Sequence, residues 1–460
     1  MAFFEFPNAR TFDSDLTWII DKIKELLAQC GSLTEAWEKF KEEFQEQLSD
    51  TVMNILEGWL ADGTLAELIQ SWIDHQPWIN VKDYGALGNG VHNDAAAIQQ
   101  AIDAASETIG TWTYMASIVY LPKGVYRIDS PLTLPANVVL QGEGINNTVI
   151  FNQGSITNTA MIKTYNYDTF VDGGSHDKWL DTKGVPCNCG FNNLTIHGNY
   201  WNATGDATVA MYAYGIDIHD VQFYGCYGWA LYLTWGDGEG DTWNLNRTKI
   251  TENYLRNVHF FACTQGLYQG SNVNDSYYDG IYMGRLDGMY GSINGTSYWT
   301  YAHFFDGFRD STKTGNYAFS MNSEGQFKGV IESTHNKRAA IFNGYFQNIE
   351  CEMYNNEYGD VQLGGSYSTY DFVVNCQYTD NANSFYIAGG SNNRYHVNLG
   401  GMTSNVLFSA PVSNSIFEIT SNGSVQLAQG GAFTNCTGNA IGAKVSAGSG
   451  VDNVWYPGKS

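Results

Sequence analysis

Hydrophobic and polar residues alternate in short runs over the C-terminal two thirds of the chain, and Asn, Gly, Asp and Ser separate one run from the next. Three runs are alike: Asn193–His197, Asp220–Cys226 and Asn257–Cys263. In the last two, a valine and a cysteine stand five positions apart. Alternation with period two predicts strands with one buried face. A loose repeat of roughly 20 to 40 residues predicts that these strands belong to the stacked coils of a β-solenoid.

Further short runs continue the pattern: Asp279–Met283, Ala340–Phe342, Phe346–Cys351, Phe372–Cys376 and Tyr395–Leu399. Asn-rich turns between them suit a solenoid because Asn tolerates left-handed backbone. The alternative is a β-sandwich or jelly roll, which would predict longer hairpins joined by two-residue turns. Few Asn-Gly or Asp-Gly pairs are flanked in that way, so the solenoid is favoured.

Residues 1–74 have a helical pattern instead. One stripe of period 3.6 consists of Leu16, Ile19, Ile20, Ile23, Leu26 and Leu27. Ser32–Glu35 and Thr64–Glu67 are capping boxes, which mark helix starts. About three helices bury little surface alone, so an ordinary helical core and packing between subunits both remain open. Acidic residues outnumber basic ones here, which favours a protein socket over a membrane or a nucleic acid.

The pattern of residues 75–155 predicts the segment in which the solenoid begins, which we call the entry. Val81–Tyr84 is expected to be a strand, and Asn93 or Asp94 to cap a helix with Ile98 and Ala101 on its buried face. Three more strands are expected: Ile118–Leu121, Val125–Ile128 and Val138–Leu140. The helix would act as a lid that stops edge-to-edge growth of the sheet. The predicted division is a helical attachment region at 1–74, the entry at 75–155, a shaft at 156–440 and a tail at 441–460.

Composition narrows the possible partners. The 460 residues include 50 glycines, 30 tyrosines and 13 tryptophans and carry a net charge of −24. Phosphate binding needs a basic surface, so a nucleic acid is not expected as a partner. No apolar run reaches the roughly 18 residues of a membrane-spanning helix, and the N-terminus has no secretory-signal pattern. The eight cysteines are scattered, which favours buried free thiols made in a reducing cytoplasm.

Two stretches resemble known families. Val81–Ala86, Asp94–Ile102 and Val119–Tyr126 resemble the entry to the pectate-lyase-like right-handed parallel β-helix. Residues 6–20 are similar to the start of tail or appendage proteins from phages of Gram-positive bacteria. Together these resemblances imply a phage tail spike or tail appendage, usually a homotrimer, with a helical virion anchor and a β-helix shaft. Family membership implies the shaft but not an activity.

One loop is the best candidate for chemistry. Polygalacturonase-type members of the superfamily use Asn-Thr-Asp, Asp-Asp and Gly-His-Gly motifs, and this sequence has none of them. The loop Trp235–Trp243 carries the candidate catalytic acids Asp237, Glu239 and Asp241 between two candidate sugar-binding rings, Trp235 and Trp243. Carboxylates one or two rungs apart span the roughly 5 to 9.5 Å used by glycosidases. A calcium site and a solvated turn are the alternatives for this loop, and metal and cofactor are unknown.

Other candidates are less distinctive. Four rings are predicted either to line a glycan groove or to form core or trimer contacts: Tyr277, Tyr278, Tyr298 and Trp299. Glu350 and Glu352 flank Cys351 and therefore share one strand face. Three histidines follow apolar strand positions, and no partner for them is evident: His197, His219 and His259.

Three functions remain open. The first is a virion appendage, acting outside the cell, that attaches through residues 1–74 and recognises a host cell-surface polysaccharide. The second is an active glycan depolymerase of the tail, a lyase or a hydrolase. The third is a secreted bacterial polysaccharide-degrading enzyme, which the missing signal sequence and the acidic N-terminal helices disfavour.

Overall fold

The chain divides into two compact units, Met1–Pro77 and Trp78–Ser460. In the computed structural model the described residues are 37–40, 58, 60–63, 78–108, 116–165, 167–168, 187–235, 252–306, 318–332, 340–354, 361–376, 384–401, 405–422, 424–427, 433–442, 444–447 and 454–455. The helices predicted over residues 1–74 lie almost wholly outside them. Residues 37–40 are helical, and the rings of Trp37 and Phe40 stack 5.5 Å apart.

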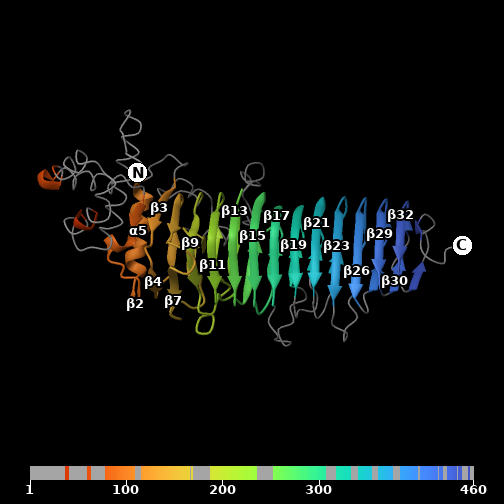
Figure 1. Ribbon diagram of the computed structural model, residues 1–460, viewed down its shortest axis with the longest axis horizontal. Helices are drawn as coiled ribbons and strands as arrows, with labels where there is room; N and C mark the ends of the chain where they lie inside the picture. Colours follow the sequence, from red (N-terminus) through yellow and green to blue (C-terminus); the bar gives the residue numbers. More distant parts are fainter. Residues whose placement is uncertain are drawn as a thin grey trace, which may run out of the picture. The chain divides into compact units, whose positions relative to one another are not determined.

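The second unit is a parallel β-solenoid, as predicted, and Figure 1 shows its strands stacked as rungs from β3 to β32. The described residues form an 18-stranded sheet, called sheet A. Its strands are β1 (Trp78–Asn80), β2 (Asn89–Asn93), β3 (Ser117–Tyr120), β4 (Gly124–Ile128), β6 (Val138–Gln141), β7 (Thr148–Asn152), β9 (Gly190–His197), β11 (Asp217–Tyr224), β13 (Tyr254–Phe261), β15 (Ser276–Gly284), β17 (Ser297–Phe305), β19 (Gly325–Glu332), β21 (Gln347–Tyr354), β23 (Thr369–Cys376), β26 (Arg394–Gly401), β29 (Ile416–Ser421), β32 (Thr437–Ile441) and β34 (Val454–Trp455).

Two further sheets complete the coils, with 13 strands in sheet B and three short strands in sheet C. Sheet B contains β5 (Leu132–Leu134), β8 (Ile162–Thr164), β10 (Ala207–Tyr212), β12 (Trp229–Thr234), β14 (Gln265–Gln269), β16 (Gly291–Ile293), β18 (Phe319–Met321), β20 (Ala340–Phe342), β22 (Val361–Leu363), β24 (Ser384–Ile387), β27 (Asn405–Phe408), β30 (Ser424–Leu427) and β33 (Lys444–Ala447). Sheet C contains β25 (Gly390–Ser391), β28 (Val412–Ser413) and β31 (Phe433–Thr434).

The sequence repeat corresponds to the register of the coils. Val221 of β11 pairs with Val258 of β13, and the backbone N–H of Cys226 lies 3.4 Å from the Sγ of Cys263. Identical residues therefore stack on one another inside the solenoid. Aromatic rings do the same, because Phe223 and Phe260 stack 4.9 Å apart. Each large side chain buried in this way stabilises the fold by roughly 1.5–3 kcal/mol.

The described cysteines agree with the prediction of buried free thiols. Those described as free and buried are Cys187, Cys189, Cys226, Cys263, Cys351 and Cys436. Burial raises the pKa of the Cys187 and Cys436 thiols above the ordinary value. A buried thiol that keeps its proton is a poor nucleophile and a poor metal ligand. These cysteines therefore contribute packing, not chemistry.

The helix α5 (Ala95–Thr108) closes the first coils, as the sequence predicts. Four residues of its inward face are fully buried: Ile98, Ala101, Ile102 and Ala105. The strand predicted over Val81–Tyr84 is instead the short 3-10 helix η2. The reason lies at Asn80, whose side chain accepts a hydrogen bond from the N–H of Lys82 and caps this turn. The strand lies just before it, at β1.

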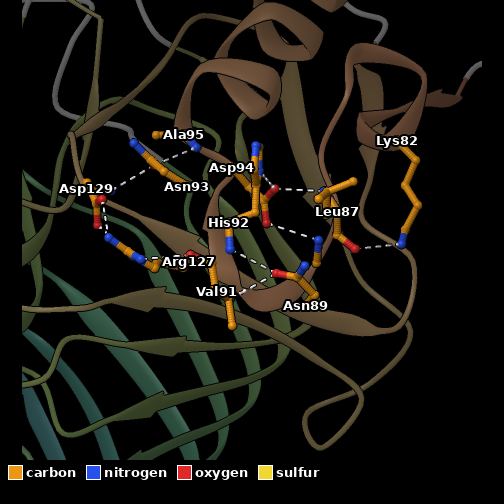
Figure 2. A network of polar contacts seen from close by, with 11 residues as sticks. Lys82, Leu87, Asn89, Val91, His92, Asn93, Asp94, Ala95, Arg127 and Asp129 are labelled. Carbon is orange, nitrogen blue, oxygen red and sulfur yellow. Dashed lines mark hydrogen bonds and ion pairs between the residues drawn. The ribbon is translucent and has the colours of Figure 1, made fainter.

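A buried carboxylate ties this entry segment together (Figure 2). Asp94 is fully buried and accepts hydrogen bonds from the N–H groups of Leu87, at 2.7 Å, and Gly88, at 3.0 Å. Its Oδ1 also lies 2.8 Å from the Nδ1 of His92. Asp94 holds the N-cap position, because its carbonyl accepts from the N–H of Ile98, while the side chain that accepts from the first helical N–H, that of Ala95, belongs to Asn93. Side-chain bonds therefore hold the tight loop before α5, in addition to the pairing of β2 with β4.

The last coils extend beyond the predicted shaft. Residues Lys444–Ala447 pair with β30, and Val454–Trp455 pair with β32. Lys444–Ala447 therefore extend sheet B and Val454–Trp455 extend sheet A. Among the described residues, no helix combines the length and the apolar character needed to cross a membrane.

Candidate functional site

Four successive strands of sheet A each contain one residue with a positive φ angle, where the strand bends. We call this position the corner. These residues are Asn193, Asp220, Asn257 and Gly280, and their φ angles lie between 50° and 64°. Asn, Asp and Gly adopt this left-handed conformation more readily than other residues. The register shifts between β17 and β19, where β19 has one residue fewer. The corner therefore ends at β17, and the pairing of β19 with β21 is regular.

Six side chains on β11 and β13 gather at this corner and form what we call the polar cluster: Asp217, His219, Asp220, Arg256, Asn257 and His259. The Nη2 of Arg256 lies 3.2 Å from Asp217 Oδ1, joining the two strands by an ion pair. Asp220 accepts a hydrogen bond of 2.7 Å from Asn257 Nδ2, and its other oxygen lies 3.0 Å from His219 Nδ1. These contacts, that of Asn257 first, lower the pKa of Asp220 below its ordinary value. Asp220 is therefore an anion and not a proton donor at neutral pH.

Asn257 also orients a histidine. Its amide nitrogen is engaged by Asp220, so its oxygen faces His259, whose Nε2 lies 3.0 Å from Oδ1. This arrangement assigns the ring proton to Nε2, because only a donor suits an amide oxygen. Burial lowers the pKa of His259 below the ordinary histidine value, so the ring is neutral at pH 7. Its Nδ1 is then an acceptor, able to bind a hydroxyl or to take up a proton.

Three tyrosines stack beside the polar cluster and form what we call the tyrosine ladder: Tyr254, Tyr277 and Tyr298. The ring centroids are 5.3 Å apart between the first two and 5.2 Å apart between the last two. Tyr254 and Tyr277 are 43% and 42% exposed, so the ladder is open to solvent. Tyr254 lies two residues before Arg256 on the same face of β13, a separation of about 7 Å. Stacked rings next to fixed charges and amides can bind a sugar by its apolar face and its hydroxyls together.

A groove of about 380 Å³ begins where the corner ends. Its lining includes Tyr301, Lys328, Glu350, Glu352 and Asp371. Glu350 and Glu352 share the outward face of β21 while Cys351 is buried between them, as the sequence predicts. Lys328 Nζ lies 2.9 Å from Glu350, and the hydroxyl of Tyr354 donates to Glu352. The exposed carboxylates of Glu350 and Glu352 therefore already have partners. The groove continues the polar surface of sheet A on the side away from the tyrosine ladder.

A larger hollow of about 660 Å³ lies over sheet B. It is lined in part by Lys163, Asp206, Trp229 and Tyr232. Tyr232 stacks on Tyr268 at 4.3 Å. The hollow combines rings and charges, but it has no oriented imidazole. The outer face of sheet A is therefore the stronger candidate.

The loop predicted to carry catalysis lies outside the described residues, including Asp237, Glu239, Asp241 and Trp243. Trp235, at its start, is described and is only 2% exposed. Its ring packs against Tyr212 and Tyr214, with centroids 5.0 and 5.3 Å away. Trp235 is therefore a core residue and not a sugar-binding one, because neither face of its ring is open to a ligand.

The four predicted tyrosine and tryptophan candidates divide equally. Tyr278 and Trp299 are fully buried, so their predicted sugar-binding role is corrected to a core role. Tyr278 donates a 2.8 Å hydrogen bond to Gln269, and Trp299 Nε1 donates to Ser297 at 3.0 Å. Tyr277 and Tyr298, one position earlier on each strand, point outward and belong to the tyrosine ladder. They remain predicted binding residues.

Sequence reasoning missed the polar cluster and Tyr254. It found no partner for the three histidines, yet His219 meets Asp220, His259 meets Asn257, and His197 packs 5.0 Å from Tyr224. The valine–cysteine repeat noted in the sequence puts the residues before Val221 and Val258 in register and could have paired these side chains. Within the described part of the chain, no group of three or more His, Cys, Asp or Glu side chains is placed to hold a metal ion.

Comparison with known proteins supports the fold and the resemblance to phage appendages. The chain is 31% identical over 188 residues to the pre-neck appendage protein of Bacillus phage B103, which covers 39% of this chain and 20% of that protein. It is 36% identical over 137 residues to mannuronan C5-epimerase AlgE5 of Azotobacter vinelandii, covering 27% and 11%. The chain therefore matches about a fifth or less of the length of these relatives.

One solved structure with similar coils is the pre-mature gene product 12 of bacteriophage phi29, at 15% identity and a TM-score of 0.45 over 83% of this chain and 54% of that one. The family described as rhamnogalacturonase A/epimerase, pectate lyase-like matches residues 78–323, which is more than half of the sequence. The solenoid, its helical lid and this match agree, and the chain belongs to the rhamnogalacturonase A/epimerase, pectate lyase-like family.

Proposed function

We propose that the chain is a phage tail appendage protein that binds a host cell-surface polysaccharide with the outer face of sheet A. The observation that carries the proposal is the tyrosine ladder, three stacked rings beside the polar cluster, of which Tyr254 and Tyr277 are exposed. Similarity to phage pre-neck appendage proteins supports the virion location. In this proposal residues 1–74 attach to other tail proteins, and the chain works as a homotrimer outside the cell.

The spacing of the ladder supports a polymeric ligand. Its rings repeat every 5.2–5.3 Å along the solenoid axis, following the roughly 4.8 Å spacing of neighbouring strands. A sugar residue in an extended polysaccharide has a similar length, so one ring can serve one residue. Arg256 and the amide of Asn257 lie on the same face and can bind hydroxyl or carboxylate groups of the chain.

The test measures binding of host cell-wall glycan to the full chain by co-sedimentation and calorimetry. Tyr277→Gln is the informative variant because this row of sheet A already contains a glutamine. Gln326 lies two strands further on, next to Tyr298. Loss of the central ring is expected to weaken binding about tenfold, since a stacked aromatic contact is worth about 1 kcal/mol or more. Tyr84→Gln, an exposed tyrosine in the entry segment, is the control. Unchanged binding by Tyr277→Gln would show that the ladder is not the binding surface.

A second candidate is cleavage or modification of the same glycan. The neutral imidazole of His259, oriented by Asn257 on the strand that also carries Arg256, is the observation that favours it. A base of this kind can take a proton from a sugar carbon or hydroxyl while the guanidinium stabilises the negative charge that develops. The assay looks for new reducing ends or unsaturated products from the glycan. Products formed by the wild type and lost in His259→Gln, with binding retained, would establish an enzyme.

Attachment and assembly have their own tests. Cross-linking in assembled particles should join residues 1–74 to other tail proteins, and cross-links only from the solenoid would contradict this part. The mass of the full chain in solution, measured by light scattering, should equal three chains. A monomer would contradict the proposed homotrimer.

A further inference from the structure

A second row of left-handed residues runs along the turns that lead into sheet A near the C-terminal end. Its members are Phe346, Tyr367, Asn392, Asn414 and Asn435, with φ between 50° and 59°. Hydrogen bonds place them in register, because the N–H of each of the first four bonds to a carbonyl of the next turn, at 2.9 to 3.1 Å. The positions are therefore equivalent in their backbone, and only the side chains differ.

Asparagine is the expected residue in such a row. It adopts the left-handed conformation with little penalty and can bond from turn to turn. Asn435 Nδ2 donates to Asn414 Oδ1 at 2.8 Å in this way. Phe346 and Tyr367 break the pattern, since large side chains are rarely found with positive φ. Their backbone strain is not required by the fold, which forms the same turn with Asn.

The two aromatic residues are also exposed. Phe346 is 60% and Tyr367 55% open to solvent, and their rings stack 5.2 Å apart at an angle of 22°. Strained backbone and exposed apolar rings are two unfavourable features at the same two residues. Strain of this kind gathers at ligand-binding sites, where the structure retains it for function. We therefore interpret the pair as retained for a function at the surface, since its rings do not pack in the interior.

The surroundings indicate the chemistry of the ligand. The five turns contain no Asp, Glu, Lys or Arg in segments 343–346, 364–368, 388–393, 409–415 and 433–436. Ser366 and Ser391 present hydroxyls 3.1 Å apart next to Tyr367, and Asn392 is exposed on the following turn. A protein interface would continue the apolar surface along the row, whereas the row continues with Asn on one side and with the exposed Glu324 in the equivalent place on the other. Flat rings beside neutral hydroxyls and amides suit an uncharged sugar.

We infer that Phe346 and Tyr367 form a stacking platform for an uncharged carbohydrate, separate from the tyrosine ladder. This inference does not depend on the ladder, because it rests on a different turn and on backbone conformation. The two sites are distinguished by their variants: Tyr277→Gln alters only the ladder, and changes at the platform leave the ladder intact.

The test replaces both platform residues by Asn, the residue at the other three positions of the row. Full-length Phe346→Asn/Tyr367→Asn and the wild type are compared on uncharged hexaoses of glucose and of N-acetylglucosamine, by saturation-transfer NMR and calorimetry. Ile416→Asn is the matched control, since Ile416 is 56% exposed on sheet A but outside the row. The double variant is expected to lose at least tenfold in affinity, while the control binds like the wild type.

Stability and mass complete the design. The double variant should melt at or above the wild-type temperature, because relief of strain offsets the lost stacking of two half-exposed rings. A lower melting temperature would give the pair a structural role and overturn the inference. Absence of binding to any uncharged hexaose, or equal binding by the double variant, would overturn it as well. A change in the mass of the assembly with unchanged sugar binding would show a contact between copies of the chain instead.

Discussion

Asn257 donates a 2.7 Å hydrogen bond to Asp220, and both residues occupy the left-handed corner position of their strands. The bond joins two neighbouring coils at the point where each strand changes direction. It also connects the carboxylate of one coil with the imidazole of His259 on the next. The corner is therefore both a feature of the backbone and the centre of the polar cluster.

The first prediction concerns acid stability. The pKa of Asp220 is lowered in the folded chain, so its carboxylate stabilises the fold above the unfolded value of about 4. That contribution is lost as the pH falls through the folded value. Asp220→Asn should therefore lose less unfolding free energy between about pH 5 and 2 than the wild type, as measured by denaturant unfolding. Asn257→Ser removes the amide that donates to Asp220 and should show the same reduced loss as Asp220→Asn. Parallel plots of unfolding free energy against pH for the wild type and both variants would contradict the prediction.

The second prediction concerns the protonation of His259. Burial lowers its pKa in the folded chain, so the unfolded chain binds more protons between that value and the ordinary value of about 6.5. Stability should rise with pH through this window, and NMR titration should place the ring below 6.5. Asn257→Asp puts a carboxylate beside Nε2 and should raise the pKa of His259. A titration identical to that of the wild type would contradict the orientation assigned here.

The architecture was predictable because it depends on local patterns. Alternation within a strand decides which side chains are buried, and the valine–cysteine repeat decides which strands stack. The helix α5 followed from its apolar face and the polar residues before it. Val81–Tyr84 was predicted wrongly because its pattern also suits one turn of 3-10 helix, and the deciding bond comes from Asn80, outside the segment.

The candidate site was less predictable because its partners are remote in sequence. Asp217 and Arg256 are 39 residues apart, and Asp220 and Asn257 are 37 apart. No local pattern reports such a pair until the coils are aligned. The alternation of side chains along a strand could still have separated the outward-facing aromatic candidates from the inward-facing ones. Tyr277 and Tyr278 are neighbours on one strand and must face opposite sides, so only one of them could bind a ligand.

The third prediction tests the corner row. Gly280 has φ of 64°, in the row that holds Asn193, Asp220 and Asn257. An added Cβ would meet no atom closer than 3.4 Å, so space is available and conformation decides the outcome. Gly280→Asn should change the free energy of unfolding by less than about 0.5 kcal/mol, while Gly280→Val should cost about 1–2 kcal/mol or more. Equal losses in both variants would show that space, not backbone conformation, selects glycine.

The fourth prediction separates the two faces of β15. Tyr278→Phe removes the hydroxyl that donates to Gln269 inside the core, which should cost about 1–2 kcal/mol of stability without affecting glycan binding. Tyr277→Gln should do the reverse, with a small effect on stability and a clear loss of binding. Thermal unfolding and calorimetry on the same preparations check both. A binding defect in Tyr278→Phe at a temperature where it is fully folded would reinstate that residue as a site residue.

The fifth prediction concerns the entry segment in Figure 2, where Asp94 holds the loop that precedes α5. Asp94→Ala leaves the N–H groups of Leu87 and Gly88 without their acceptor and removes the contact with His92. The variant should lose roughly 2–4 kcal/mol, and hydrogen exchange at these two amides should accelerate before exchange in the coils. Asp83→Ala, an exposed acid in the same segment, is the control and should stay within about 0.5 kcal/mol of the wild type. Uniform acceleration along the whole solenoid would mean that the entry segment and the coils unfold as one unit, and the loop would then have no local role in closing the end of the sheet.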